Sequence, residues 1–134
     1  NLAPKSSFLL EKHLEDYIIR NWSNIELNKD YDIHKENNKL CTQYSTGSGP
    51  LDILAISKDK KEFLVIELKK GRASDVVMGQ IQRYMGHIKN NLAGEKDVKG
   101  LIIALDDDKN LRDALSVAPN IKFMKYEVSF KLVE

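Results

Sequence analysis

The sequence predicts a mixed α/β fold in which helices flank a central sheet. Residues 7–22 carry apolar side chains at helical spacing, and residues 62–68 form an apolar run of the kind found in central strands. Helical and strand patterns then alternate towards the end of the chain. The expected order is helix, three strands, helix, strand, helix, strand, antiparallel in the first hairpin and parallel where helices cross over.

Size and composition fit a single domain over residues 1–134. The chain is 42% hydrophobic and 31% charged, which is typical of a folded protein, and its net charge of +1 neither indicates nor excludes nucleic acid. Apolar runs fall short of the roughly 18 residues of a membrane span, so we expect no membrane partner. Cys41 alone cannot form an intramolecular disulfide, which favours a cytoplasmic location. Because the first residue is Asn1, the domain is also compatible with excision from a longer chain.

The first element is expected to be an amphipathic helix over residues 7–22, with Ser6 and Ser7 as possible caps. Its apolar residues recur at steps of three and four: Phe8, Leu10, Leu14, Tyr17, Ile18 and Trp22. Residues 25–38 mix polar side chains with isolated aliphatic ones. This pattern allows either a short edge strand or a loop.

Turn-forming sequences separate the three strands that follow. Residues 40–45 can form a strand, which the Gly-Ser-Gly-Pro segment 47–50 ends. Residues 51–56 and 62–68 are apolar runs joined by the lysine-rich segment 58–61. The pattern predicts an antiparallel hairpin of buried strands.

The C-terminal half is expected to contain a helix, a strand, a second helix and a second strand. In this order they cover residues 74–94, 98–105, 106–118 and 121–133. Ser74 and Asp75 can cap the first of these helices. The acidic residues Asp106, Asp107 and Asp108 are expected to favour the positive end of the next helix rather than to bind metal.

Two carboxylates and a lysine lie at the ends of the expected hairpin strands. A turn centred near residues 59–60 places Asp52 opposite Glu67. Lys69, two residues beyond Glu67, then points to the same face of its strand. Carboxylate oxygens are ligands of Mg²⁺ and Mn²⁺, and the backbone carbonyl of Leu68 is a further candidate ligand. A nearby ammonium can orient or help deprotonate an attacking water during phosphodiester hydrolysis.

A structural role for the same residues remains open at this point. Asp52 and Glu67 can be strand-end acids in salt bridges with Lys69 or Lys70. The acid-x-Lys spacing alone is not specific, because residues 59–61 also match it within a turn. Basic residues between positions 58 and 72 offer a local basic patch, although the turn lysines fit a solvated hairpin equally well.

The segment resembles the PD-(D/E)xK nuclease superfamily. Residues 50–52 (Pro-Leu-Asp) and 67–69 (Glu-Leu-Lys) fill its motif, and the order of elements is similar to the core of its restriction-endonuclease-like fold. Within this superfamily the chain is most similar, over residues 8–105, to the nuclease domain of NucS (EndoMS) type endonucleases. The most specific segments are residues 49–55, 65–73 and 79–84.

The resemblance implies a role for individual residues. The metal-binding aspartate and glutamate of the family fall on Asp52 and Glu67, and its catalytic lysine falls on Lys69. A glutamate on the first helix that binds or positions metal matches Glu15. Glu11, one helical turn earlier, is the alternative.

The helix after the motif adds a second feature of the resemblance. Gln80 and Tyr84 share a helical face and match the Gln-xxx-Tyr feature of RecB-like members. Gln80 is expected to bond the motif lysine or a phosphate, and Tyr84 to pack in the core. Basic residues near the motif are candidate contacts to nucleic acid: Lys70, Arg72 and Arg83.

Motif and resemblance together predict a Mg²⁺- or Mn²⁺-dependent endonuclease of DNA repair, restriction or defence, with DNA favoured over RNA. Full-length NucS enzymes carry a separate N-terminal DNA-binding and dimerisation domain, which nothing in this sequence matches. A separate DNA-binding domain or a homodimer partner is therefore expected. The alternative is a non-catalytic nucleic-acid-binding or assembly domain on the same fold.

A zinc site is not expected from the sequence. His13, His34 and His87 show no zinc-binding spacing, and the chain has only one cysteine.

Overall fold

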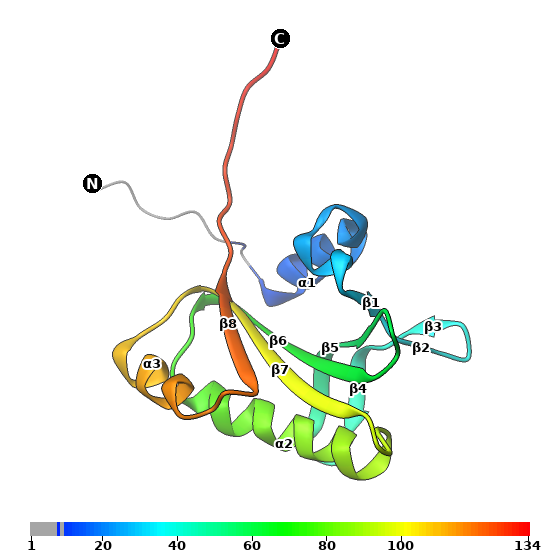
Figure 1. Ribbon diagram of the computed structural model, residues 1–134. Coiled ribbons are helices and arrows are strands. Elements are labelled where there is room, and N and C mark those ends of the chain that lie inside the picture. The colour runs from blue at the N-terminus through cyan, green and yellow to red at the C-terminus, as the bar shows by residue number, and fades with distance from the viewer. Residues whose placement is uncertain (1–7, 9) are drawn as a thin grey trace.

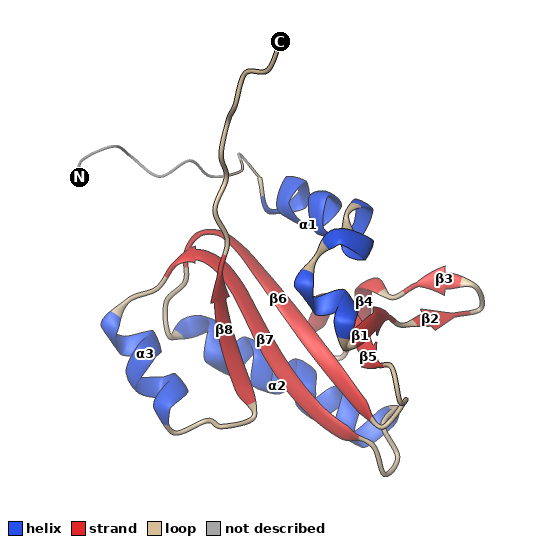
Figure 2. Cartoon of the chain, turned by 45° about the horizontal axis from the view of Figure 1, so that its top comes forward, coloured by secondary structure: helices blue, strands red, loops and turns tan. Residues whose placement is uncertain are grey.

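A mixed sheet packed between helices forms the body of the protein (Figures 1 and 2). The computed structural model describes residue 8 and residues 10–134, so the expected caps Ser6 and Ser7 lie outside the described residues. Helix α1 covers one face of the sheet, and helices α2 and α3 cover the other. The predicted fold class is confirmed.

The described elements follow the expected order, with additional short strands before the first long hairpin. They are α1 (Glu11–Arg20), the 3-10 turns η1 (Trp22–Asn24) and η2 (Glu26–Lys29), β1 (Tyr31–Ile33), β2 (Lys35–Glu36), β3 (Lys39–Leu40), β4 (Thr42–Thr46), β5 (Gly49–Ser57), β6 (Glu62–Arg72), α2 (Val76–Asn91), β7 (Asp97–Asp106), α3 (Lys109–Ser116) and β8 (Ile121–Lys125). No helix in the described ranges is long and apolar enough to cross a membrane.

The main sheet has the strand order β1-β5-β6-β7-β8, and β4 also pairs with β5. Strands β5 and β6 are antiparallel, whereas β6–β7 and β7–β8 are parallel because a helix connects each pair. Ile53 lies opposite Ile66, and Ile56 lies opposite Phe63. This is the register predicted from a turn centred near residues 59–60.

The sheet separates two hydrophobic cores. On the α2 side, Ile81 and Ile88 are fully buried in a core that also contains Leu54 and Val65. On the α1 side, the core contains Leu14, Ile18, Ile53, Leu64 and Ile66. Neighbouring residues of β5 and β6 therefore enter opposite cores, which explains why both strands are almost continuously apolar.

Strand β5 changes its facing around Asp52. Leu51 contributes to the core on the α2 side, and Ile53 contributes to the core on the α1 side. Residues two positions apart on a regular strand share one face. The regular alternation is thus interrupted where the polar residue lies.

The last strand is shorter than predicted. β8 ends at Lys125 instead of residue 133, and Figure 1 shows the following segment leaving the sheet. The side chain of Phe130 is 86% exposed. The alternating pattern alone does not make this segment a strand. A strand also needs a neighbour to pair with, and no described strand lies beside residues 126–133.

The helix boundaries also differ from the expected ones. Helix α1 spans Glu11–Arg20 rather than residues 7–22, and Trp22 begins a 3-10 turn. Helix α3 begins at Lys109, three residues later than expected. The Asp108 side chain caps it by accepting a hydrogen bond from the Leu111 N–H at 2.8 Å, so the capping role is confirmed for Asp108.

Residues 25–38, for which the sequence left two possibilities open, contain both turns and strands. Strands β2 and β3 form a small hairpin of their own. Asn37 and Asn38 connect them with φ angles of 53° and 64°. Asparagine tolerates this left-handed conformation, which a two-residue hairpin turn requires.

Candidate functional site

Asp52 and Glu67 lie side by side at the point where β5 and β6 leave their regular pairing. Ile53 and Ile66 are opposed, and the two carboxylates occupy the next position on each strand. The Leu68 N–H donates a hydrogen bond to Asp52 Oδ2 at 2.8 Å. The structure thus brings together the two carboxylates that the sequence placed opposite each other.

Glu67 is only 4% exposed, and it is the only buried charged residue in the described part of the chain. Among the described residues, its Oε1 atom has no hydrogen-bond partner. Leaving a buried polar atom unpaired costs about 1–3 kcal/mol, so such atoms are uncommon in folded proteins. A bound cation would satisfy this oxygen.

The pKa of Glu67 is raised to about 8, and burial is the largest cause. The negative charge of Asp52 and a hydrogen bond between the two carboxyl groups also raise it, whereas Lys69 lowers it. Burial also raises the pKa of Asp52, while the Leu68 N–H and the Gln43 amide lower it. Two neighbouring carboxyl groups with raised pKa values favour either a shared proton or a divalent cation.

Gln43, on β4, connects the first helix to this cluster. Its Nε2 atom donates to Glu15 Oε1 at 2.6 Å and to Asp52 Oδ1 at 3.1 Å. The φ angle of Gln43 is 49°, which is uncommon for a residue other than glycine. No local sequence pattern singles out Gln43, because its role depends on the pairing of β4 with β5 and on the packing of α1.

Both glutamates of helix α1 reach the end of the β5–β6 hairpin. Glu15 does so through Gln43, and burial raises its pKa. Glu11 Oε2 accepts a hydrogen bond from the backbone N–H of Lys70 at 3.1 Å. The two candidates for the helix glutamate therefore lie at the same edge of the site, one helical turn apart.

Lys69 is half-buried close to the carboxylates, and its positive charge lowers the pKa of both Asp52 and Glu67. The side chain of Leu68 packs in the core on the α1 side, so only its backbone is available to the site. Lys70 and Arg72 are exposed on the last residues of β6. The motif lysine and the exposed basic residues thus follow one another along the strand.

Helix α2 places Gln80 and Tyr84 on one face. Tyr84 is 4% exposed and belongs to the core, as expected. The Gln80 amide donates to the Tyr84 hydroxyl at 3.1 Å, so its observed partner is neither of those expected, the motif lysine or a phosphate. A Cβ atom on Gly49 would lie 3.7 Å from the same hydroxyl, which places the pair near the start of β5. Arg83 is exposed on the same helix.

The lysines of the β5–β6 turn do not join the basic residues at the other end of β6. At about 3.3 Å per residue, Lys61 and Lys70 are separated by about 30 Å along the strand. Lys58 instead forms an ion pair with Asp32 at 2.6 Å. The single basic patch between residues 58 and 72 is therefore not formed.

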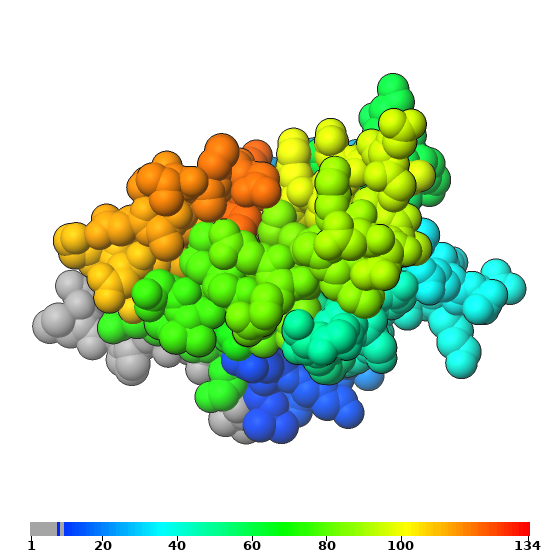
Figure 3. Space-filling model, turned by 90° about the horizontal axis from the view of Figure 1, so that it is seen from below, coloured from blue at the N-terminus to red at the C-terminus, as the bar shows by residue number. Residues whose placement is uncertain are grey.

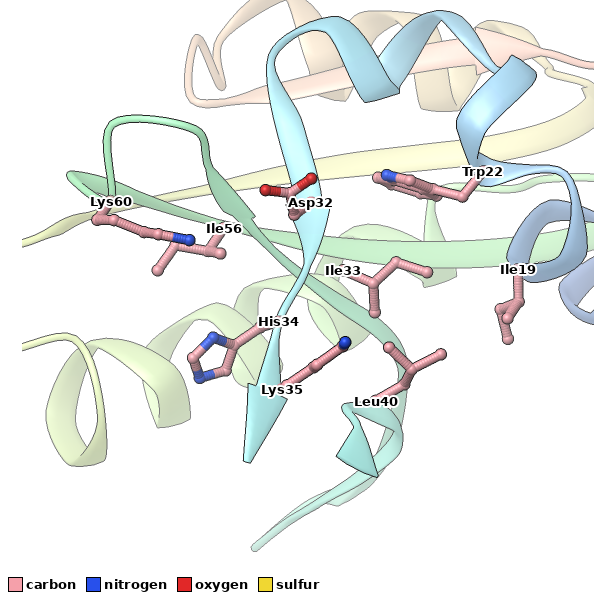
Figure 4. Close-up of a pocket in the computed structure, with 9 residues that line it drawn as sticks. All are labelled: Ile19, Trp22, Asp32, Ile33, His34, Lys35, Leu40, Ile56 and Lys60. Atoms are coloured by element: carbon pink, nitrogen blue, oxygen red, sulfur yellow. The ribbon is translucent and has the colours of Figure 1, made fainter. Parts of the chain in front are cut away.

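An open pocket of about 600 Å³ lies away from the carboxylates (Figure 4). Its lining residues are Ile19, Trp22, Asp32, Ile33, His34, Lys35, Leu40, Ile56 and Lys60. None of them belongs to the Asp52–Glu67 cluster. The candidate site is thus a strand-end cluster and not this pocket.

Comparison with known proteins identifies one family. Residues 10–129 match the endonuclease NucS C-terminal domain. Over 65 residues, or 48% of the chain, the sequence is 32% identical both to endonuclease NucS 1 of Halobacterium salinarum and to endonuclease NucS of Methanocaldococcus jannaschii. The matched segment covers 27% and 24% of the length of those proteins.

Solved structures show the same fold. A complex of EndoMS with double-stranded DNA matches 98% of the chain with a TM-score of 0.70 and 21% identity. A repair endonuclease from Pyrococcus abyssi matches 92% of the chain with a TM-score of 0.69 and 18% identity. The chain spans about half of each of these proteins, 48% and 50% respectively.

Proposed function

The chain belongs to the endonuclease NucS C-terminal domain family, and on this premise we propose that it is a metal-dependent nuclease domain of the PD-(D/E)xK type that hydrolyses DNA. The principal support is the Oε1 atom of Glu67, which is buried next to Asp52 and has no hydrogen-bond partner among the residues that the structure describes. The names of the relatives support the nuclease class, and the DNA complex of a structural neighbour supports the substrate.

The donors in this cluster fit a hard divalent cation. Asp52, Glu67 and the backbone carbonyl of Leu68 would hold Mg²⁺ or Mn²⁺, both of which prefer oxygen ligands. The cation would supply the chemistry of a Lewis acid, polarising a phosphoryl oxygen and favouring ionisation of a water molecule. Its charge would also offset the repulsion that raises the pKa of Glu67.

The surrounding residues would orient the substrate and the water. The Lys69 ammonium would position the attacking water and offset the charge that develops on the phosphate. Glu15 would fix the orientation of Asp52 through Gln43 and help to hold the cation. Gln80 would turn from Tyr84 towards a bound phosphate. The exposed basic residues would contact the DNA backbone: Lys70, Arg72 and Arg83.

We expect contacts from outside this domain to help select the DNA. The described residues form one main sheet with a core on each face, which supports a single domain over residues 1–134. Since similar structures are about twice as long, a separate DNA-binding domain or a second copy of the chain would supply the missing selectivity. Cutting both strands of a duplex would require two active sites.

The proposal is tested by cleavage of end-labelled single-stranded, duplex, branched and mismatched DNA, and of RNA, with Mg²⁺ or Mn²⁺. Asp52→Asn and Lys69→Ala are compared with the wild-type protein. Asp75→Asn and Lys89→Ala are matched controls, because both residues are exposed on helix α2 or at its start. We expect metal-dependent cutting of DNA that both site variants lose and both controls keep.

The other outcomes separate the alternatives. If folded wild-type protein binds DNA but cuts nothing and is not stabilised by Mn²⁺, the chain is a non-catalytic nucleic-acid-binding domain. Stabilisation by Mn²⁺ that Asp52→Asn abolishes, without cutting, would assign catalysis to a longer assembly that contains this site. Cutting that survives in Asp52→Asn would contradict the proposed site.

A further inference from the structure

A second group of potential metal ligands lies on the β2–β3 hairpin. One ligand atom from each of His34, Glu36 and Cys41 lies within 4.8 Å of the other two. The Nε2 atom of His34 is 3.8 Å from Glu36 Oε2. None of these residues takes part in the proposed DNA-cleavage site.

Backbone hydrogen bonds fix two of the three residues at the base of the hairpin. The N–H of Cys41 donates to the carbonyl of His34 at 2.8 Å, and the N–H of His34 donates to the carbonyl of Leu54 at 2.9 Å. The N–H of Leu54 in turn donates to the carbonyl of Cys41 at 2.9 Å. This closed set of bonds holds His34 and Cys41 opposite each other against strand β5.

The side chains are also held by contacts outside the cluster. Tyr44 donates its hydroxyl to Glu36 Oε2 at 3.1 Å, and the His34 ring packs edge-on against Phe63 with centroids 5.1 Å apart. Neighbours of this kind orient ligands in metal sites. Contacts outside the cluster therefore help to position the side chains of His34 and Glu36.

The side chains of this cluster differ in exposure. The Cys41 residue is 5% exposed, whereas the side chains of His34 and Glu36 are 21% and 38% exposed. An ion can therefore enter past the histidine and the glutamate, with the sulfur at the inner end. His34 also lines the open pocket of Figure 4, which leads to this side of the hairpin.

We propose that His34, Glu36 and Cys41 form a second metal site, which takes a borderline transition ion of the Zn²⁺ type with a water as fourth ligand. Imidazole nitrogen, thiolate sulfur and carboxylate oxygen are the three donor types that Zn²⁺ accepts. Their present separations need only small side-chain movements to reach Zn–ligand distances of about 2.0–2.3 Å. Mg²⁺, which requires oxygen donors, is not expected to bind here.

The charges of the three ligands suit a divalent ion. Burial lowers the pKa of His34 and thereby favours the neutral ring, which has a lone pair to donate. Burial raises the pKa of the Cys41 thiol, so the ion must displace its proton to solvent. The thiolate and the Glu36 carboxylate then balance the two positive charges of the ion. Lys60 and Lys96 lie close enough to lower the pKa of His34.

No sequence pattern indicates this site, because its ligands come from both arms of a short hairpin. Histidine and cysteine are seven positions apart and meet only through the Asn37-Asn38 turn. A metal bound there would cross-link the two arms of the β2–β3 hairpin. It would stabilise the fold independently of DNA cleavage.

The test is titration of the metal-free protein with Co²⁺, followed by absorption, and with Zn²⁺, followed by thermal unfolding. We expect a thiolate-to-cobalt charge-transfer band at one equivalent, its loss on addition of Zn²⁺, and a rise in Tm of about 5 °C with saturating Zn²⁺. Cys41→Ala should abolish the band. Glu36→Gln keeps an acceptor for Tyr44, so it should fold while binding Co²⁺ at least about tenfold more weakly.

Two control variants distinguish metal binding at this second site from metal binding at the proposed nuclease site. His13→Ala, which removes an exposed histidine on α1, and Asp52→Asn should both retain the cobalt band and the Zn²⁺-induced rise in Tm. The absence of a thiolate band in folded wild-type protein would overturn the second site. Unchanged Co²⁺ affinity in Glu36→Gln would remove Glu36 from it and contradict the proposal as stated.

Discussion

Glu67 combines burial, an unpaired oxygen and a neighbouring negative charge in one side chain. Its folded-state pKa of about 8 lies above the ordinary value of 4.5. Between these two pH values the folded protein binds more protons than the unfolded chain. The contribution of Glu67 to the stability of the metal-free protein therefore falls as pH rises from about 4.5 to 8.

This dependence predicts that Glu67→Gln stabilises the metal-free protein at high pH. The amide cannot ionise, so at pH 9 we expect a free energy of unfolding higher than that of the wild type by on the order of 3 kcal/mol. At pH 5 the difference should largely disappear. Denaturant unfolding in EDTA at both pH values measures it, with the exposed Glu95→Gln as control. Equal pH profiles for wild type and Glu67→Gln would show that Glu67 is not perturbed.

Gln43 supports a second prediction at the scale of single residues. Because its amide contacts both Glu15 and Asp52, Gln43→Ala should lower Mn²⁺ affinity by about 10–100-fold, as the loss of an outer contact to a metal ligand does. Calorimetric titration with Mn²⁺ measures this. Gln82→Ala, which removes an exposed glutamine of α2, should bind Mn²⁺ as the wild type does. An unchanged Mn²⁺ affinity in Gln43→Ala would show that the contacts of Gln43 with Glu15 and Asp52 do not support metal binding.

The candidate site was only partly predictable from the sequence. Asp52 and Glu67 lie on one hairpin, so turn geometry alone fixes their register and brings them together. Gln43 reaches them through a second strand pair and an uncommon backbone conformation, which no local pattern reveals. Gln80 was correctly placed on a helical face shared with Tyr84, but its amide donates to the Tyr84 hydroxyl rather than to the motif lysine or a phosphate.

At the scale of elements, the contact between α2 and β7 leaves no room for a larger residue at Gly100. A Cβ atom there would lie 2.8 Å from Met85 Sδ and 3.0 Å from Ile81 Cδ1. Both side chains are buried and cannot move away freely. Close approach of helix and strand therefore depends on the absence of a side chain.

Gly100→Ala should consequently lower the free energy of unfolding by about 1–3 kcal/mol. Gly86→Ala is the matched control on α2, because a Cβ there meets nothing within 4 Å. Alanine favours the helix, so this control should gain about 0.5–1 kcal/mol. Chemical denaturation of both variants gives the comparison. A neutral or stabilising Gly100→Ala would mean that the helix packs farther from β7.

The long elements followed from the sequence, whereas the short ones and several boundaries did not. The β5–β6 hairpin and α2 are long, and their apolar residues recur at regular spacing, so the sequence alone predicts them. The strands β1, β2 and β3 are two or three residues long, so no periodicity can develop within them. The length of β8 was overestimated for a related reason. The alternation of apolar and polar residues in one strand does not show whether a neighbouring strand is there to pair with it.

At the scale of the whole molecule, the residues after β8 differ in how much they contribute to the stability of the fold. The Tyr126 hydroxyl donates to the Lys70 carbonyl, and the backbone N–H of Tyr126 donates to the Ala104 carbonyl at 3.0 Å. Phe130 and Leu132 are 86% and 83% exposed. Tyr126 therefore links this segment to the end of β6, and the residues beyond it contact little.

Removal of residues 130–134 should leave Tm within about 2 °C of the wild type, since little apolar area is lost from the folded state. Tyr126→Ala in the full chain should lower Tm by more than this, because it removes the ring packed against Phe8. Thermal unfolding of both variants measures the difference. A larger loss from the truncation than from Tyr126→Ala would show that the exposed residues stabilise the fold.

The measurement that tests the proposed nuclease most directly is the single-turnover rate of DNA cleavage at saturating Mn²⁺, compared between wild type and Glu67→Gln. Glu67 provides the buried oxygen, without a partner in the described part of the chain, on which the proposed metal site depends. We predict that Glu67→Gln lowers the rate by at least about 100-fold while the protein remains folded. A rate within twofold of the wild type would contradict the assignment of Asp52 and Glu67 as the metal-binding pair.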